Sequence, residues 1–237
     1  MQTYTAGAQC TANFVFTDAT DVYIGQAAHC SGTGGATETN GCLAGSLPLG
    51  TPVNVNGASK PGIMVYNSWL TMQAAGETNP DACQYNDLAL IKLDPADHAK
   101  VNPSVPTYGG PVGVGDATAA GETVYSYGNS SLRGGVALLS PKTGVSLGTN
   151  ANGWNHPVYT VSPGVPGDSG SAFLDKDGKA IGVLSTLALA PLPLSNGVSD
   201  LDHMLDYLLS HGGPNVQLAN GTEAFTPKLI GLIPLGL

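Results

Sequence analysis

The sequence is short of charge. Only 11% of its residues are charged and lysine and arginine together number 8, whereas about a quarter of an average globular protein is charged. With 17 acidic residues the formal net charge is −9. So acidic a chain lacks the basic surface that binds phosphates, and we therefore expect neither nucleic acid nor an anionic membrane as a partner.

Long apolar runs are also missing. No stretch of about 20 apolar residues occurs, so no segment is predicted to span a bilayer as a helix. The first residues, Met-Gln-Thr-Tyr, have neither the basic start nor the apolar core of a signal peptide. If the protein is exported, we expect its targeting segment to be absent from this sequence.

Glycine and proline, by contrast, are abundant, with 33 and 17 residues. Both residues place turns in a chain, so their number favours many short strands over long helices. With 237 residues, of which 42% are hydrophobic, the chain is long enough to bury one large core or two small ones.

Short runs rich in apolar residues and bounded by turn residues predict strands along most of the chain. The predicted strands are residues 9–16, 21–28, 52–55, 62–66, 88–93, 122–127, 136–140, 144–148, 158–162, 171–174 and 180–186. Strands at this spacing favour an all-β sandwich or barrel. One helix is predicted from Asp200 to Ser210, because leucines recur there at helical spacing between a capping residue and Gly212.

The turn Gly167-Asp168-Ser169-Gly170 carries the main chemical signal. A serine attacks a carbonyl only when a base takes its proton and N–H groups receive the charge that develops on the oxygen. The glycines let the backbone turn sharply and approach a substrate, and the N–H groups of Gly167 and Ser169 can act as the donors. The same residues also suit a plain tight turn before a strand, so the turn alone leaves both interpretations open.

A candidate base and a candidate acid stand upstream. His29 ends an apolar run in the sequence Ala-Ala-His-Cys, and Asp87 precedes the apolar run Leu-Ala-Leu-Ile-Lys-Leu. Taken singly, each also suits a packed residue or a turn. The order His29, Asp87, Ser169 is the order of chymotrypsin, whereas α/β-hydrolases and subtilisins use other orders.

Other residues are weaker candidates for these roles. His98 and His156 lie beside prolines or in segments expected to be polar loops, and Asp94 is typical of a turn because it precedes Pro95. His203, on the predicted helix, is expected to be a solvated side chain.

Together the three segments resemble the signatures of the chymotrypsin-like serine peptidases, over roughly residues 10–207. The resemblance implies an all-β fold of two antiparallel six-stranded barrels with a C-terminal helix. Residues 1–105 would form the barrel that carries the histidine and the aspartate. Residues 106–237 would form the barrel that carries the serine, followed by the helix and a tail, with the active site in the cleft between the barrels.

The resemblance also implies an activity, that of a secreted serine endopeptidase acting on proteins or peptides. Ser169 would be the nucleophile, His29 the general base and Asp87 the residue that orients the histidine, while the N–H groups of Gly167 and Ser169 would form the oxyanion hole. No cofactor and no metal are implied, and we expect a monomer.

Specificity is implied by position relative to the nucleophile. In the relatives, the residue six places before the serine lies at the bottom of the primary pocket, and here it is Pro163. Ser185, Thr186 and Leu187 match the strand edge that pairs with the substrate backbone. No acid is present for binding lysine or arginine, and Leu187 would narrow the pocket in favour of small or medium apolar side chains.

The four cysteines suit a secreted protein with two disulfides, although four buried thiols are the alternative. Sequence alone leaves three pairings open. The resemblance favours a Cys10–Cys30 bridge, which leaves Cys42 to pair with Cys83. A zinc site is not indicated, since the only close histidine–cysteine pair, His29 and Cys30, is adjacent in sequence.

Two features depart from many relatives. Animal relatives often insert a newly cut apolar N-terminus beside the acid that precedes the nucleophile, here Asp168, and this sequence has no matching segment near Met1. We expect Arg133 to pair with Asp168 instead, the alternative being a solvated loop arginine. The tail is apolar over residues 229–235 and is expected to pack on the body of the protein.

Three other functions compete with peptidase activity. A lipase or esterase of the α/β-hydrolase type would want Gly-x-Ser-x-Gly, whereas here the fifth position is Ser171, and the required alternation of strands and helices is missing. An inactive binding module of the same fold would usually have lost a triad member. A structural secreted β protein would explain the glycine content but not the three signatures.

Overall fold

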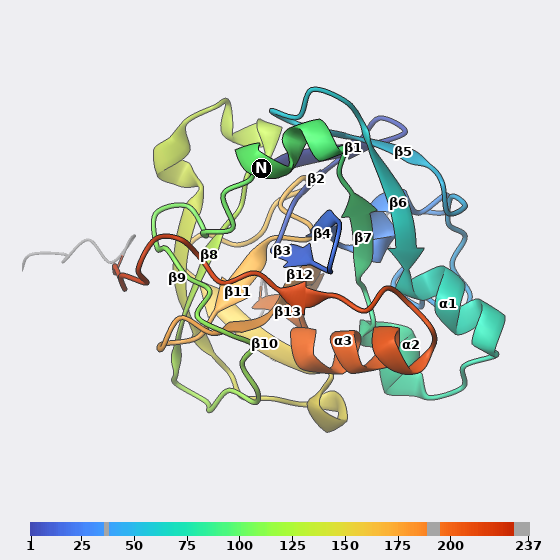
Figure 1. The fold of residues 1–237 in the computed structure, drawn as a ribbon. Helices are drawn as coiled ribbons and strands as arrows, with labels where there is room; N and C mark the ends of the chain where they lie inside the picture. The colour runs from blue at the N-terminus through green and yellow to red at the C-terminus, as the bar shows by residue number, and fades with distance from the viewer. Residues whose placement is uncertain (36–37, 189–194, 230–237) are drawn as a thin grey trace, which may run out of the picture.

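A computed structural model describes residues 1–35, 38–188 and 195–229 of the chain, without the side chains of residues 187 and 188. The strands form two sheets, one built mainly from the first half of the chain and the other from the second half (Figure 1). No helix in the described part of the chain combines the length and the apolar character that crossing a membrane requires.

The first sheet has eight strands in the order β14-β3-β4-β7-β6-β5-β1-β2. In chain order its strands are β1 (Gln2–Thr5), β2 (Ala8–Thr11), β3 (Val15–Thr17), β4 (Val22–Gln26), β5 (Pro52–Val55), β6 (Gly62–Asn67), β7 (Ala89–Lys92) and β14 (Gln217–Leu218). All of its pairings are antiparallel, which suits the short turns between successive strands.

This first sheet curls, because one stretch of chain reaches both of its ends. β2 pairs with β1 at one edge, and after three residues the same chain pairs with β4 as β3. At the bend, the N–H group of Ala12 still donates to Met1 O, while that of Asn13 already donates to Gly25 O, both at 2.9 Å. The sequence predicted a closed barrel here; the structure shows a curled sheet, because the ladder is interrupted where the strand changes partner.

The second sheet is a closed barrel of six strands in the order β10-β13-β12-β11-β8-β9. They are β8 (Thr123–Tyr127), β9 (Pro141–Ser146), β10 (Asn155–Thr160), β11 (Ala172–Leu174), β12 (Ala180–Ala188) and β13 (Ser195–Asp200). The predicted six-stranded barrel of the second half is thereby confirmed.

Two segments of the second half differ from their predictions. β13 was not predicted, because its sequence Ser-Asn-Gly-Val-Ser-Asp has hardly any apolar residues, although all six residues are buried. Residues 136–140, predicted as a strand, instead contain a 3-10 turn over Ala137–Leu139, whose apolar side chains are not buried.

Apolar clusters fill both sheets and the space between them. Ile24 and Ile91 belong to the core of the first sheet, and Phe173 and Val198 to the core of the barrel. A third cluster joins the two sheets, with members such as Leu88 from the first half. This shared core fixes the two halves relative to each other, and so fixes any site that lies between them.

The helices are α1 (Ser68–Ala75), α2 (Pro80–Tyr85) and α3 (Leu201–Ser210). The predicted C-terminal helix is confirmed as α3, and the Asp200 side chain caps it by accepting from the N–H group of His203. Helices α1 and α2 were not predicted, although asparagine side chains cap both, at Asn67 and Asn79. Both insert between β6 and β7, just before Asp87.

The tail after α3 is a strap across both halves, seen in red in Figure 1. It pairs with β3 through β14, and the Phe225 ring then packs against the Tyr125 ring of β8 at 5.5 Å between centroids. Backbone hydrogen bonds from Gly110 N to Glu223 O and from Thr226 N to Tyr108 O hold it in place. The tail thus packs on the body of the protein as far as it is described; residues 230–235 of the apolar stretch lie outside the described residues.

Candidate active site

His29 lies in the short 3-10 helix η1 (Ala28–Ser31), directly after β4. Its Nδ1 atom is 2.7 Å from Asp87 Oδ2, and its backbone N–H group donates to Asp87 Oδ1 at 2.9 Å. A carboxylate only accepts, so the hydrogen of the neutral imidazole lies on Nδ1 and a lone pair remains on Nε2. The sequence-predicted base and orienting acid are therefore in contact.

The side chain of Asp87 is itself fixed by burial and by a hydrogen bond from the other half of the chain. Its side chain is almost fully buried, and Oδ2 also accepts a hydrogen bond from Ser185 Oγ at 2.6 Å. Ser185 comes from β12, so a residue of the barrel fixes an acid of the first sheet. Ser185, which was predicted to bind substrate, thus also orients the Asp87 carboxylate.

The pKa of His29 responds to two opposing effects. Burial of the imidazole disfavours its charged form and by itself lowers the pKa, but the negative charge of Asp87 and its hydrogen bond outweigh that effect. The pKa of His29 is therefore raised above the ordinary value. A raised pKa makes the ring a better proton acceptor.

Ser169 lies in the predicted turn, where Gly167 and Gly170 both adopt positive φ angles of 95° and 85°. At Gly170 a Cβ atom would lie 2.6 Å from Thr11 O and 2.9 Å from Ala27 N, so only glycine fits there. The first sheet contacts the turn through β2, where Thr11 N donates a hydrogen bond to Ser169 O at 2.8 Å. The turn is therefore built into the boundary between the two halves.

Ser169, His29 and Asp87 line one pocket of about 620 Å³. Around the serine, the N–H group of Asp168 donates to Val165 O and that of Gly170 donates to Leu184 O. Within the described part of the chain, the N–H groups of Gly167 and Ser169 have no acceptor. Two neighbouring backbone donors are thus left unused beside the hydroxyl group.

Asp168 is completely buried and paired with two cations. Arg133 forms an ion pair with its carboxylate, as the sequence predicted, and Lys142 Nζ lies 3.1 Å from Oδ2. Lys142 also donates to the carbonyl oxygens of Ser162 and Pro163 at 3.3 and 3.1 Å. Lys142 was not predicted from the sequence, although a lysine between two predicted strands, in a chain with so few basic residues, was the available signal.

The ionisation of this buried cluster follows from its partners. Burial by itself raises the pKa of Asp168. Hydrogen bonding and attraction from Arg133 and Lys142 lower this pKa by more than burial raises it, so the pKa lies below its ordinary value. Burial is also the largest effect on Lys142, whose pKa is lowered; Asp168 opposes that shift and Arg133 adds to it. The cluster is therefore an ionised anion shared by two cations.

The residues predicted for specificity are only partly in the pocket. Ser185 and Thr186 line it together with Gly164 and Leu184. Pro163 is not among the lining residues, and its carbonyl oxygen accepts a hydrogen bond from Lys142. The side chain of Leu187, expected to narrow the pocket, lies outside the described residues; its backbone pairs with Asn196 of β13.

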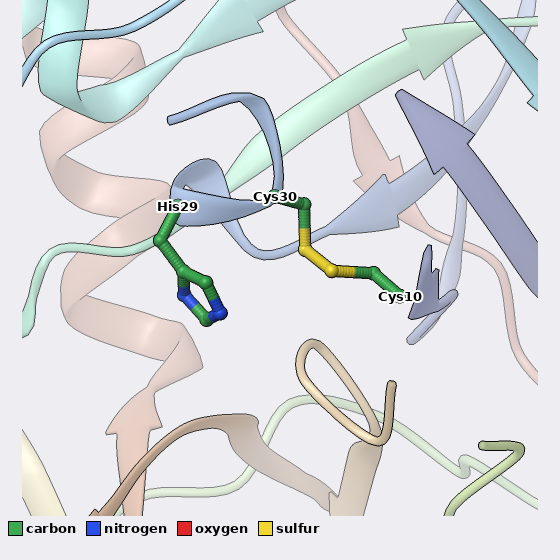
Figure 2. A group of neighbouring side chains, drawn as sticks. All are labelled: Cys10, His29 and Cys30. Carbon is green, nitrogen blue, oxygen red and sulfur yellow. A yellow bond between two sulfur atoms is a disulfide. The ribbon is translucent and has the colours of Figure 1, made fainter. Parts of the chain in front are cut away.

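Both disulfides form as the resemblance implied, Cys10 with Cys30 and Cys42 with Cys83. Figure 2 shows the first bridge beside the His29 ring, where it ties β2 to η1. Among the described residues, these three side chains form the sole group of three or more potential metal ligands whose ligand atoms all lie within 4.8 Å of one another. Since the two sulfur atoms are bonded to each other, the group offers no thiolate to a metal.

A second histidine–aspartate pair lies elsewhere. The sequence placed His156 in a polar loop, but it lies fully buried in β10, with Nε2 2.7 Å from Asp200 Oδ2 and Nδ1 3.0 Å from Thr149 Oγ1. Asp200 also caps α3 and accepts from His203. Every polar atom of this ring is engaged, which is typical of a structural histidine.

Comparison with solved structures places this architecture among known proteases. Thermobifida fusca protease A superposes with a TM-score of 0.56 at 15% identity, covering 93% of this chain and 96% of that one. A glutamic acid-specific serine protease gives 0.56 at 16% identity, covering 92% and 97%. Cellulomonas bogoriensis chymotrypsin gives 0.53 at 16% identity, covering 92% and 95%.

No protein-family model and no curated protein sequence matches the chain. The likeness to the solved structures is therefore one of fold. The chain has the chymotrypsin-like fold of these serine proteases, with two disulfides, one closed barrel and one curled sheet.

Proposed function

We propose that the protein is a secreted serine endopeptidase that cleaves proteins or peptides through an acyl-enzyme. One observation carries the proposal: His29 Nδ1 is 2.7 Å from a buried carboxylate oxygen of Asp87, in the wall of the same pocket that Ser169 lines. The chymotrypsin-like fold and the disulfides support the protease class and the extracellular location. The proposed division of labour places histidine and aspartate in residues 1–105 and the serine in residues 106–237.

In the first half of the proposed reaction, Ser169 Oγ forms a bond to the scissile carbonyl carbon while its proton passes to His29 Nε2. The imidazolium is stabilised by Asp87 and gives this proton to the leaving amine nitrogen as the C–N bond breaks. The result is an ester of Ser169. Water then attacks the ester with His29 again taking the proton, and the acid product and free serine are released.

The negative charge of the tetrahedral intermediate needs hydrogen-bond donors. The two unused N–H groups, of Gly167 and Ser169, are the proposed oxyanion hole, and losing one such donor costs about 3–4 kcal/mol of barrier. Asp168 and its two cations hold the turn that presents these donors. These three residues would act on catalysis by positioning that turn.

The proposal is tested with a fluorophosphonate that reacts with activated serines. The wild-type chain is expected to form an adduct on Ser169, and the Ser169→Ala variant to form none while keeping its circular dichroism spectrum. Ser171→Ala is the matched control, because Ser171 is buried and bonded to Asp168 O. Undiminished labelling of Ser169→Ala would refute the assignment.

The alternatives give different results in the same preparation. An inactive binding module of this fold would leave the wild-type chain unlabelled. An esterase would be labelled and would hydrolyse short acyl esters but leave peptide bonds in a denatured protein intact. An endopeptidase is expected to cut internal bonds of that protein at a rate that the phosphonate abolishes.

A further inference from the structure

An unusual amount of apolar surface is exposed on one short segment beside the site. Between Ser131 and Leu139 four apolar residues are exposed by 49% or more: Leu132 by 71%, Val136 by 49%, Leu138 by 85% and Leu139 by 53%. Exposed apolar side chains that gather in one place commonly mark a surface that binds something. We call these four residues the apolar rim.

The apolar rim begins next to residues that a pocket-lining side chain holds, although its own four residues do not line the pocket. Gln9 lines the pocket, and both the oxygen and the nitrogen of its side-chain amide form hydrogen bonds to the backbone at or just before the start of the segment. Its Oε1 atom accepts from Ser131 N at 2.9 Å, and its Nε2 atom donates to Asn129 O at 3.0 Å. Leu132 therefore follows directly on Ser131, whose N–H group is held by a pocket residue.

The segment is also fastened to the serine turn. Arg133 donates to Leu139 O at 2.7 Å while it pairs with Asp168, so one guanidinium group joins the far end of the apolar rim to the residue before Ser169. Ser130 Oγ accepts from Leu132 N and donates to Pro166 O. These bonds give the segment a fixed place relative to the nucleophile, which a loose loop would lack.

The apolar rim lies on one particular side of the nucleophile. The serine turn is held between β12, through Gly170 N to Leu184 O, and β2, through Thr11 N to Ser169 O. A substrate paired with the β12 edge at Ser185 and Thr186 would place its acyl part there. Its leaving part must then continue past β2, towards Gln9 and the segment that follows it.

We propose that the apolar rim binds apolar side chains of the polypeptide substrate on the leaving-group side of the cleaved bond. This inference rests on the proposed peptidase function and adds to it a preference on that side. An apolar occupant is indicated because the exposed side chains are apolar, while Arg133, the one charged residue among them, is already paired and only 10% exposed.

The test is a digest of a proteome-derived peptide library with cleavage sites read by mass spectrometry. The enzymes compared are the wild type, a Leu132→Ser/Leu138→Ser double variant and a Leu209→Ser control on the exposed face of α3. Each digest is normalised to the concentration of active sites titrated by the phosphonate. Melting curves check that all three are folded.

The wild type is expected to enrich leucine, isoleucine, valine and phenylalanine at the second and third residues after the cut. In the double variant this enrichment should be about fivefold smaller than in the wild type. A factor of that size corresponds to the free energy gained when one aliphatic side chain is partly buried. Preferences before the cut should stay unchanged, and Leu209→Ser should match the wild type. Equal enrichment in the double variant and the wild type would overturn the inference.

Two further outcomes also decide the matter. A wild-type dimer seen by light scattering that dissociates in the double variant would show that a second copy of the chain occupies the apolar rim, and would overturn the inference. A wild-type chain that neither reacts with the phosphonate nor cuts any peptide would overturn the proposed function itself, and this inference with it.

Discussion

The ammonium nitrogen of Lys142 lies 3.1 Å from a carboxylate oxygen of Asp168, and neither side chain is exposed to solvent. A lysine at full burial is stable only when all its donors are used, and the carbonyl oxygens of Ser162 and Pro163 take the others. Lys142 therefore links the strand β9, the backbone of Ser162 and Pro163 and the residue that precedes Ser169.

Replacing Lys142 with methionine should destabilise the fold and disorder the serine turn. The variant leaves a buried carboxylate with one cation in place of two, and breaking buried ion pairs costs about 3 kcal/mol or more. Urea denaturation should report that loss, and phosphonate titration should find a smaller active fraction. Lys176→Met, at an exposed ion pair, is the control; identical behaviour of the two variants would contradict the role given to Lys142.

Replacing Asp87 with asparagine should abolish most turnover. Asparagine keeps the shape but can donate to Nδ1, which favours the wrong tautomer of His29, and the loss expected for such a triad is about four orders of magnitude in kcat. The measurement is peptide hydrolysis at saturating substrate. Asp94→Asn, the alternative acid, should turn over like the wild type, and a comparable loss there would reverse the assignment.

The dependence of kcat/KM on pH should show the raised pKa of His29. The imidazole must be neutral to accept a proton, so activity should rise as pH rises through that pKa, which Asp87 holds above the ordinary value of about 6.5. In Asp87→Asn the residual activity should rise at lower pH, because burial alone lowers the pKa. A midpoint that did not move would show that Asp87 does not set it.

Removing the Phe225 ring should loosen the strap across the two halves. The ring packs edge-on against Tyr125 and lies beside Gly178, and Phe225→Ala should lower the free energy of unfolding by about 1–2 kcal/mol, since the side chain is only partly buried. Thermal melts should show the decrease. Leu229→Ala, at an exposed position, should melt like the wild type; equal melting of both variants would argue that the strap adds no stability.

Sequence was most informative where local chemistry leaves few choices. The glycines around Ser169 are required by backbone approach and positive φ, and the capping Asp200 begins a helix that the leucine spacing continues. The two disulfides pair as the family resemblance implies, although the cysteine spacing alone left three pairings open. These features could be predicted because each depends on neighbours in the chain or on a motif.

Sequence was least informative where burial depends on partners distant in the chain. β13 is a buried strand of mostly polar residues, and some of their side chains bond to distant parts of the chain, as Asn196 does with Thr160 at 2.8 Å. His156 sits beside a proline and yet is fully buried in β10. Burial of Lys142 is offset by its ion pair with the buried carboxylate of Asp168. No pattern of hydrophobicity encodes such pairings, since their energy arises only once the fold has formed.

The counter-ions of Asp168 have a consequence for control. Both Arg133 and Lys142 are ordinary side chains within the polypeptide, so the ion cluster at Asp168, next to Ser169, is complete as soon as folding ends. No severed peptide bond has to deliver a positive charge there. The charge balance of Asp168 is therefore set by folding itself, through two side chains that lie 35 and 26 residues before it in the chain.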